Sequence, residues 1–159
     1  VNFNPTAEEI VEIAELSAKQ VEKFNIKPRI ALITYSNFGS ADGDDAKKMK
    51  KAVQLLKQRN PKMIVDGEMQ AHLPFNLDLL KENHPFSELA EKGANVLIFP
   101  NLSSSNIAYN LVKEIADIEK IGPILLGLKK PVHVLQLGST TREIVNMIAI
   151  AVVDAQMNK

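Results

Sequence analysis

Two short segments made almost entirely of apolar residues constrain the fold most strongly. Residues 28–35 (PRIALITY) and 94–99 (ANVLIF) are nearly continuous apolar runs. Runs of this kind are typical of strands buried on both faces of a sheet. Segments with helical spacing of apolar residues alternate with them along the chain. We therefore predict an α/β fold with a mostly parallel sheet and helices on both faces.

The other elements are predicted from apolar spacing and from capping residues. Thr6 followed by Glu9, and Thr140 followed by Glu143, each form the pattern of a capping box at a helix start. The predicted helices cover residues 6–24, 42–59, 77–81, about 106–117 and about 138–156, and the predicted short strands cover residues 63–65 and 131–135.

The last predicted helix carries apolar residues on nearly every face. A helix of this kind is buried on more than one side, which a single lobe of 159 residues could hardly achieve. We therefore expect residues 1–121 to form an α/β lobe. We expect residues 122–159 to pack toward a missing first lobe or a partner subunit, and the chain, which begins at Val1, to be part of a longer protein.

Composition excludes several classes of function. The chain has 19 Lys+Arg, 19 Asp+Glu and no Cys. A formal charge of zero argues against capture of nucleic acid or of an anionic membrane. The missing cysteines exclude disulfides and thiolate nucleophiles, and no apolar run approaches the ~18 residues of a membrane span. No signal peptide is visible, so we expect a cytoplasmic protein.

Three predicted loops lie where open α/β sheets bind ligands, beyond the carboxyl ends of the strands. They are residues 36–40 (SNFGS), 66–70 (DGEMQ) and 101–106 (NLSSSN). The first and third precede helices, whose amino ends suit phosphate or carboxylate groups. The alternative is that their Ser and Asn side chains only cap these helices. No GxxxxGK[ST] or GxGxxG pattern decides between the two.

The acidic and histidine residues leave further alternatives. Asp66 and Glu68 are two apart, which places both carboxylates on one side of a strand. Such a pair could bind Mg²⁺ or share a proton, or it could be an exposed turn. His72, His84 and His133 lack metal-binding spacing and are interpreted as structural. We therefore predict no metal site.

Five ordered motifs resemble the phosphate acetyltransferases. They are residues 32–40, 65–70, 95–102, 106–112 and 121–132, and the resemblance extends over roughly residues 28–156. The resemblance implies a two-lobed, typically dimeric fold like that of isocitrate and isopropylmalate dehydrogenases. The family domain is about twice this length, so this chain is expected to be its carboxyl-terminal half.

A narrower resemblance rests on residues 36–40, 131–139 and 152–156. These segments look like the phosphotransacetylase-like region at the carboxyl end of large NADP-dependent malic enzymes. The resemblance implies a homo-oligomer, dimer or higher, that binds acetyl-CoA or CoA as an allosteric effector. NADP and a divalent metal would belong only to the upstream malic-enzyme domain, and this region would hold no cofactor of its own.

Three positions depart from the pattern of active transferases. Active members carry Ser-Arg at Gln136-Leu137, an Asp at Glu143 and commonly an Arg at Glu114. The Arg binds phosphate or acyl phosphate, and the Asp is the proposed base on the CoA thiol. Losing such a cation typically lowers the rate by ~10² to 10³. Only three Arg are present in the chain, which agrees with the absence of Arg at positions 137 and 114.

The resemblance also implies a set of CoA-binding residues. They are Ser36, Asn37, Gly39, Ser40, Tyr109, Ile121, Gln136 and Leu137, although Tyr109 could equally be a core residue of a helix. We expect no catalytic residue in this region. If the region were catalytic, Glu143 would be the candidate. The alternatives to a regulatory region are an active phosphate acetyltransferase and a dimerisation module without ligand.

Overall fold

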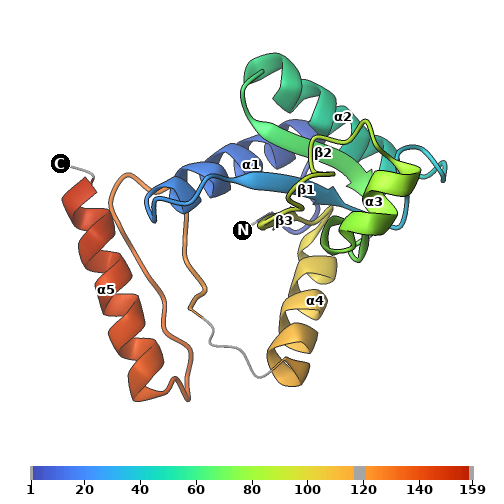
Figure 1. Cartoon of the computed structure of the whole chain (residues 1–159). Helices are drawn as coiled ribbons and strands as arrows, with labels where there is room; N and C mark the ends of the chain where they lie inside the picture. The colour runs from blue at the N-terminus through green and yellow to red at the C-terminus, as the bar shows by residue number, and fades with distance from the viewer. Residues whose placement is uncertain (1, 117–120, 158–159) are drawn as a thin grey trace. The chain divides into compact units, whose positions relative to one another are not determined.

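The computed structural model describes residues 2–116 and 121–157. Its contacts divide the chain into two compact units, Val1–Tyr109 and Asn110–Lys159. The first unit contains a three-stranded parallel sheet in the order β2-β1-β3, with bounds β1 Arg29–Ile33, β2 Ile64–Met69 and β3 Val96–Ile98 (Figure 1). This confirms the predicted parallel α/β arrangement.

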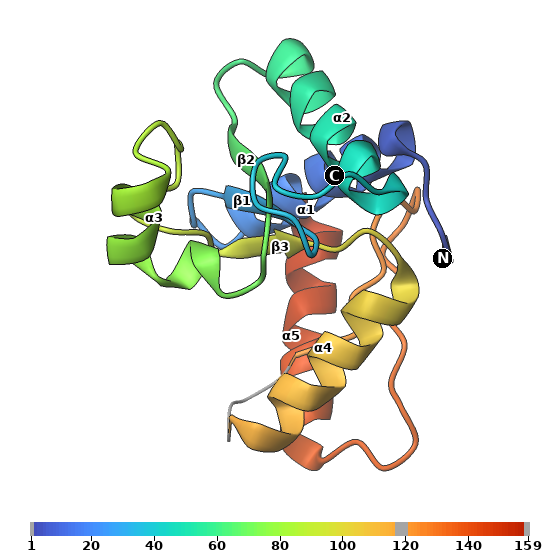
Figure 2. The same cartoon turned by 90° about the vertical axis from the view of Figure 1, so that its right-hand side faces the viewer.

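Helices cover both faces of this sheet because β1 is apolar on both sides. Ile30 and Leu32 pack with α1 (Ala7–Glu22) and α2 (Asp44–Arg59), whereas Ala31 and Ile33 pack with residues from η1 (Leu73–Phe75) and α3 (Leu77–Asn83). The same helices can be followed in the view turned by 90° (Figure 2). Alternate side chains of one continuous apolar run therefore supply two separate cores.

The helix starts follow from local chemistry. Thr6 and Glu9 form the predicted capping box at α1. The start of α2 lies two residues later than predicted, because Gly43 occupies its N-cap position and Asp44 and Asp45 form its first turn. Acidic side chains in the first turn stabilise a helix by interacting with its dipole.

The second unit contains the end of α4 (Leu102–Ile115) and all of α5 (Thr141–Met157). Thr140 and Glu143 form the predicted capping box, with a 2.7 Å bond from the Thr140 amide to Glu143 and a 3.2 Å bond back to Thr140 Oγ1. The expected end of α4 near Asp117 falls outside the described residues.

The predicted strand at residues 131–135 is wrong. The structure has only an isolated antiparallel bridge between His133 and Ile124 in this segment. A strand requires a neighbouring ladder, and Pro131 can donate no backbone hydrogen bond to one. The carboxylate of Asp154 in α5 lies 3.2 Å from the His133 ring, and both side chains are nearly buried, which is consistent with a structural histidine.

Candidate functional site

The turn that follows β1 meets the end of β2 at the carboxyl edge of the sheet. The parallel register pairs Leu32 with Gly67 but Ile33 with Met69, which leaves Glu68 as an extra residue in β2. An extra residue of this kind is a β-bulge, and it re-aims the side chain that it carries. The segment 66–70 is therefore the end of a bulged strand, and the prediction of a separate loop there is wrong.

The Glu68 side chain is buried and binds the 36–40 turn. Its Oε1 atom accepts hydrogen bonds from Ser36 Oγ at 2.8 Å and from the Gly39 amide at 2.5 Å. Its backbone carbonyl accepts a third, from the Phe38 amide at 2.7 Å. Among the described residues, Glu68 Oε2 is buried without a hydrogen-bond partner. The interpretation of Glu68 as an exposed turn acid is therefore wrong.

Gln70 adds a second connection between the same two segments. Its backbone amide donates to Asn37 Oδ1 at 2.7 Å, and its side-chain amide donates to the Tyr35 carbonyl at 2.9 Å. Ser40 Oγ accepts from the Asn37 amide at 2.8 Å within the turn. Four of the predicted site residues, Ser36, Asn37, Gly39 and Ser40, are thus held together in one hydrogen-bonded turn.

Asp66 points to a different part of the first unit. Its carboxylate lies 3.2 Å from Lys57 Nζ on α2 and accepts a hydrogen bond from the Glu88 amide at 3.1 Å. The two carboxylates therefore bind different segments of the first unit, and the described residues contain no cluster of three or more metal-ligating side chains.

The third segment, after β3, is mostly helix. The first residue of α4 is Leu102, so residues 102–106 are not a loop as predicted. Asn101 Oδ1 accepts a hydrogen bond from the Ser104 amide at 2.9 Å, as a helix cap does. Asn101 also donates to Asp45 at the start of α2, at 3.4 Å. The capping interpretation of this segment is therefore confirmed for Asn101.

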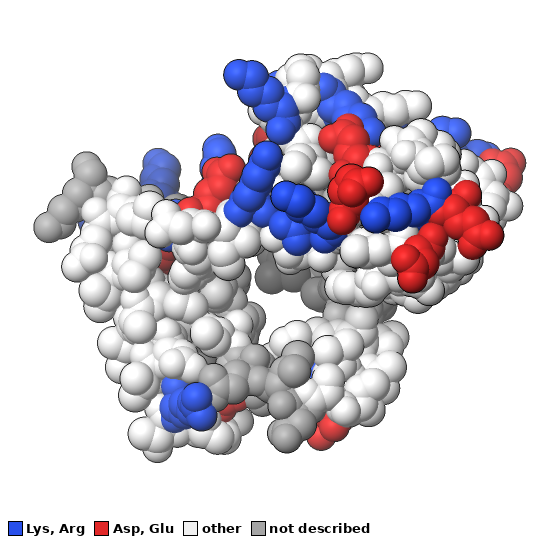
Figure 3. All heavy atoms as spheres, in the orientation of Figure 1, with Lys and Arg blue, Asp and Glu red and all other residues white. Residues whose placement is uncertain are grey.

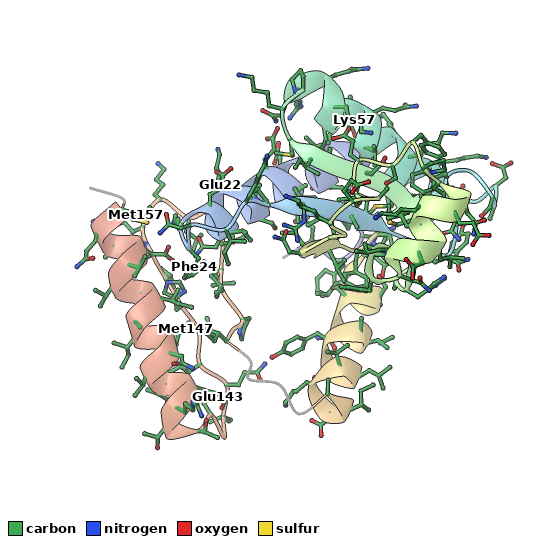
Figure 4. The ribbon with its side chains drawn as sticks, in the orientation of Figure 1. Glu22, Phe24, Lys57, Glu143, Met147 and Met157 are labelled. Atoms are coloured by element: carbon green, nitrogen blue, oxygen red, sulfur yellow. The ribbon has the colours of Figure 1, made fainter. Side chains whose placement is uncertain are left out.

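The remaining predicted site residues lie on other elements. Tyr109 is part of α4 and is 42% exposed. Ile121 and Gln136 are exposed, and Leu137 is completely exposed in the turn that precedes α5. Glu143 lies in the first turn of α5, where it is labelled in Figure 4. That these residues line one CoA site stays a prediction.

A pocket of about 430 Å³ lies at the opposite edge of the sheet. It is lined by residues next to the amino ends of β1 and β2, among them Pro28, Ile64 and the exposed cations Lys27, Arg59 and Lys62. The sequence indicates only the carboxyl edge and does not predict this pocket. It also missed Glu68 as the partner of the 36–40 turn, although Gly67 is a residue type that often marks a bulge.

No helix in the part of the chain that the structure describes combines the length and the apolar character that a membrane crossing requires.

Comparison with known proteins agrees with this architecture. The chain is 46% identical over 156 residues to an NADP-dependent malic enzyme of Haemophilus influenzae, covering 98% of this chain and 20% of that protein. It is 40% identical over 157 residues to a phosphate acetyltransferase of Clostridium acetobutylicum, covering 98% of this chain and 47% of that protein. The chain therefore spans from a fifth to about half the length of these relatives.

A solved structure shows the same fold. The crystal structure of a phosphotransacetylase from Streptococcus pyogenes matches 99% of this chain and 47% of its own, with a TM-score of 0.92 and 34% sequence identity. The family model described as "Phosphate acetyl/butaryl transferase" matches residues 1–152. The chain therefore belongs to the phosphate acetyl/butyryl transferase family.

Proposed function

We propose that this chain is a regulatory and oligomerising phosphotransacetylase-like region of an NADP-dependent malic enzyme. It binds acetyl-CoA as an allosteric effector and does not transfer the acetyl group. The upstream part of the same polypeptide carries out the oxidative decarboxylation of malate to pyruvate. Relatives named as malic enzymes support the proposed context, and a relative named as a phosphate acetyltransferase supports the transferase-like character of the region.

The single observation that carries the proposal is the residue at position 137. In the active transferases that the chain resembles, this position is an Arg that binds phosphate or acyl phosphate. The chain has Leu137, whose side chain is fully exposed and can neither neutralise charge nor donate a hydrogen bond. A preorganised cation at such a site is worth about 10² to 10³ in rate.

The environment of Glu143 supports the same conclusion. Its carboxylate accepts a hydrogen bond from the Thr140 amide, and the Glu143 amide donates to Thr140 Oγ1. This capping box explains the presence of Glu143 without a catalytic role. The position at which many family members carry a further Arg is Glu114, an exposed acid 3.7 Å from Lys113.

Apolar surface on two helices supports the oligomerising role. On α4, Ile107, Leu111 and Ile115 follow a helical spacing and are each more than half exposed. On α5, Val145, Ile148 and Val152 also follow a helical spacing and are 49 to 57% exposed. Figure 3 shows few charged residues over α5 on the face drawn, whereas they gather over the first unit. Contiguous apolar surface of this kind marks contact surfaces.

The alternative is an active phosphate acetyltransferase that interconverts acetyl-CoA plus phosphate with CoA plus acetyl phosphate. The 40% identity to an enzyme of that name favours it. It requires another cation in place of the missing Arg, and Glu143 as the base.

Two measurements on the whole protein separate these functions. We expect acetyl-CoA to raise the melting temperature saturably, because a ligand that binds only the folded state stabilises it. We expect no thioester to form from acetyl phosphate and CoA. Thioester formation that Glu143→Gln abolishes would favour the transferase. No thermal shift with millimolar acetyl-CoA would favour a module without ligand.

A further inference from the structure

The 36–40 turn has a backbone conformation that requires support. Phe38 and Gly39 have successive positive φ angles of 49° and 91°. A positive φ is unfavourable for any residue except Gly, so Phe38 keeps this conformation only where surrounding contacts fix it. The contacts that fix it are the packing of the Phe38 ring against His84 and Phe86 and the hydrogen bonds made by this turn.

Those hydrogen bonds converge on one residue. Glu68 is 1% exposed and accepts from Ser36, Phe38 and Gly39, two of these bonds through Oε1 and one through its backbone carbonyl. Ser36 Oγ, which donates to Glu68, also accepts from the Ala41 amide at 3.1 Å, so the same side chain connects both ends of the turn. The bulge in β2 is what places Glu68 beneath the turn.

The side-chain oxygens of the turn already form hydrogen bonds with the turn itself or with the end of β2. Ser36 Oγ binds Glu68, Asn37 Oδ1 accepts from Gln70, and Ser40 Oγ accepts from the Asn37 amide. A ligand that binds at this turn would therefore depend on the conformation of the turn, which Glu68 stabilises, and less on hydroxyl groups without a hydrogen bond.

We infer that Glu68 is a positioning residue for ligand binding at this turn. It acts through the Oε1 acceptor and does not touch the ligand, since its side chain is buried. This inference rests on the proposed function, because the ligand in question is acetyl-CoA. Glu68 is not among the CoA-binding residues that the family resemblance implies, and its role becomes visible only through the bulge and the hydrogen bonds.

The test compares two substitutions of similar size in the whole protein. Glu68→Gln keeps an oxygen acceptor at the same distance along the side chain, whereas Glu68→Met fills the space without one. We expect calorimetry to give an acetyl-CoA dissociation constant within about twofold of wild type for Glu68→Gln. For Glu68→Met we expect it to be about tenfold weaker, the effect of losing one to two hydrogen bonds.

A second readout follows the turn without any ligand. In Glu68→Met, amide hydrogen exchange at Phe38, Gly39 and Ala41 should be about tenfold faster than in wild type, and Glu68→Gln should restore slow exchange. Asn95→Ala is the matched control. Asn95 makes similar side-chain bonds to the backbone of Arg29 and Lys27, at the other edge of the sheet. It should leave the exchange of the turn unchanged.

The outcomes are distinguishable. Unchanged exchange in Glu68→Met would overturn the inference, and so would faster exchange with unchanged acetyl-CoA affinity. If wild type itself binds no acetyl-CoA, the proposed function fails, and the exchange rates still decide whether Glu68 holds the turn. If Glu68→Met does not fold, Ser36→Ala removes the Oγ that accepts from the Ala41 amide and donates to Glu68 Oε1. Exchange must then be severalfold faster at Ala41, which loses its acceptor, and at Gly39, because its acceptor Glu68 loses the bond to Ser36. Unchanged exchange at Gly39 would also overturn the inference.

Discussion

Asp66 and Glu68 stand two positions apart and hold different parts of the first unit. Asp66 binds Lys57 and the Glu88 amide, whereas Glu68 binds the 36–40 turn. Both side chains are buried, and a buried carboxylate is tolerated only where hydrogen bonds or an opposite charge compensate for lost hydration. Each is therefore expected to be sensitive to the loss of its partner.

Lys57→Met tests the partner of Asp66. Burial by itself lowers the pKa of Lys57, but the nearby Asp66 and Glu88 carboxylates outweigh it and raise the pKa above its usual value of 10.5. The raised pKa means that the pair stabilises the folded state at neutral pH and that this stabilisation is lost as the pH rises through the folded pKa. We expect Lys57→Met to lower the melting temperature at pH 7 and the difference from wild type to shrink as the pH rises past the usual lysine pKa of 10.5 and through the raised pKa of Lys57.

Lys47→Met is the control for that prediction. Lys47 lies 2.8 Å from Asp42, closer than Lys57 lies to Asp66, but both members of this pair are exposed. Exposed ion pairs contribute little to stability, so its melting temperature should stay near that of wild type. An equal loss in both variants would show that burial of Asp66 is not what makes the Lys57 pair matter.

The sequence predicted this chemistry only in part. Alternation along a strand placed Asp66 and Glu68 on one side, which holds for a regular strand. The extra residue in β2 breaks that alternation. Gly67 was visible in the sequence, but a single Gly does not say whether a strand bulges or ends there. The partners of the two acids also come from other segments of the chain, namely α2, the Glu88 amide and the 36–40 turn.

At the scale of elements, the pairing of β1 with β2 depends on Gly67. Its φ is +138°, and a Cβ atom there would lie 2.7 Å from the Leu32 carbonyl oxygen of β1. We expect Gly67→Ala to lower the free energy of unfolding by on the order of 3 kcal/mol, because it adds backbone strain and a clash with a neighbouring strand. Chemical denaturation measures this loss.

Gly138→Ala separates the clash from the strain. Gly138 also has a positive φ, of 87°, but a Cβ atom there would meet nothing within 4 Å. Only the conformational cost of about 1 kcal/mol should appear. A loss as large as that of Gly67→Ala would contradict the role assigned to close strand packing.

The starts of α1 and α5 were predictable because their signals are local. Thr6 with Glu9 and Thr140 with Glu143 form the capping boxes that their three-residue spacing predicted. The segment 131–135 was not predictable in the same way. Its residue types suit a strand, but a strand also needs a partner at the right distance, and the structure provides one bridge, to Ile124.

At the scale of the whole molecule, the apolar stripe on α5 is expected to lie in a contact between subunits or lobes. Ile148→Glu places a charge in the middle of this stripe, where Ile148 is 57% exposed. Burying an unpaired charge is costly, so we expect sedimentation of the whole protein to show a smaller species than wild type. Gln156→Glu, at an exposed position near the end of the same helix, is the control and should leave the assembly unchanged.

An unchanged sedimentation profile for Ile148→Glu, with unchanged thermal stability, would contradict the assignment of this stripe to a contact.

The family and the sheet could be predicted from the chain alone because motifs and apolar runs lie within it. What covers α4 and α5 could not, because an amphipathic or apolar helix specifies that it has a partner and not which one.

We expect the region to bind a thioester without transforming it. One calorimetric titration of acetyl-CoA into the whole protein in a phosphate buffer tests this expectation. The heats should saturate at a fixed stoichiometry and then fall to those of dilution, with no free CoA thiol formed. A steady heat flow with accumulating CoA thiol, or no binding heat at all, would contradict it.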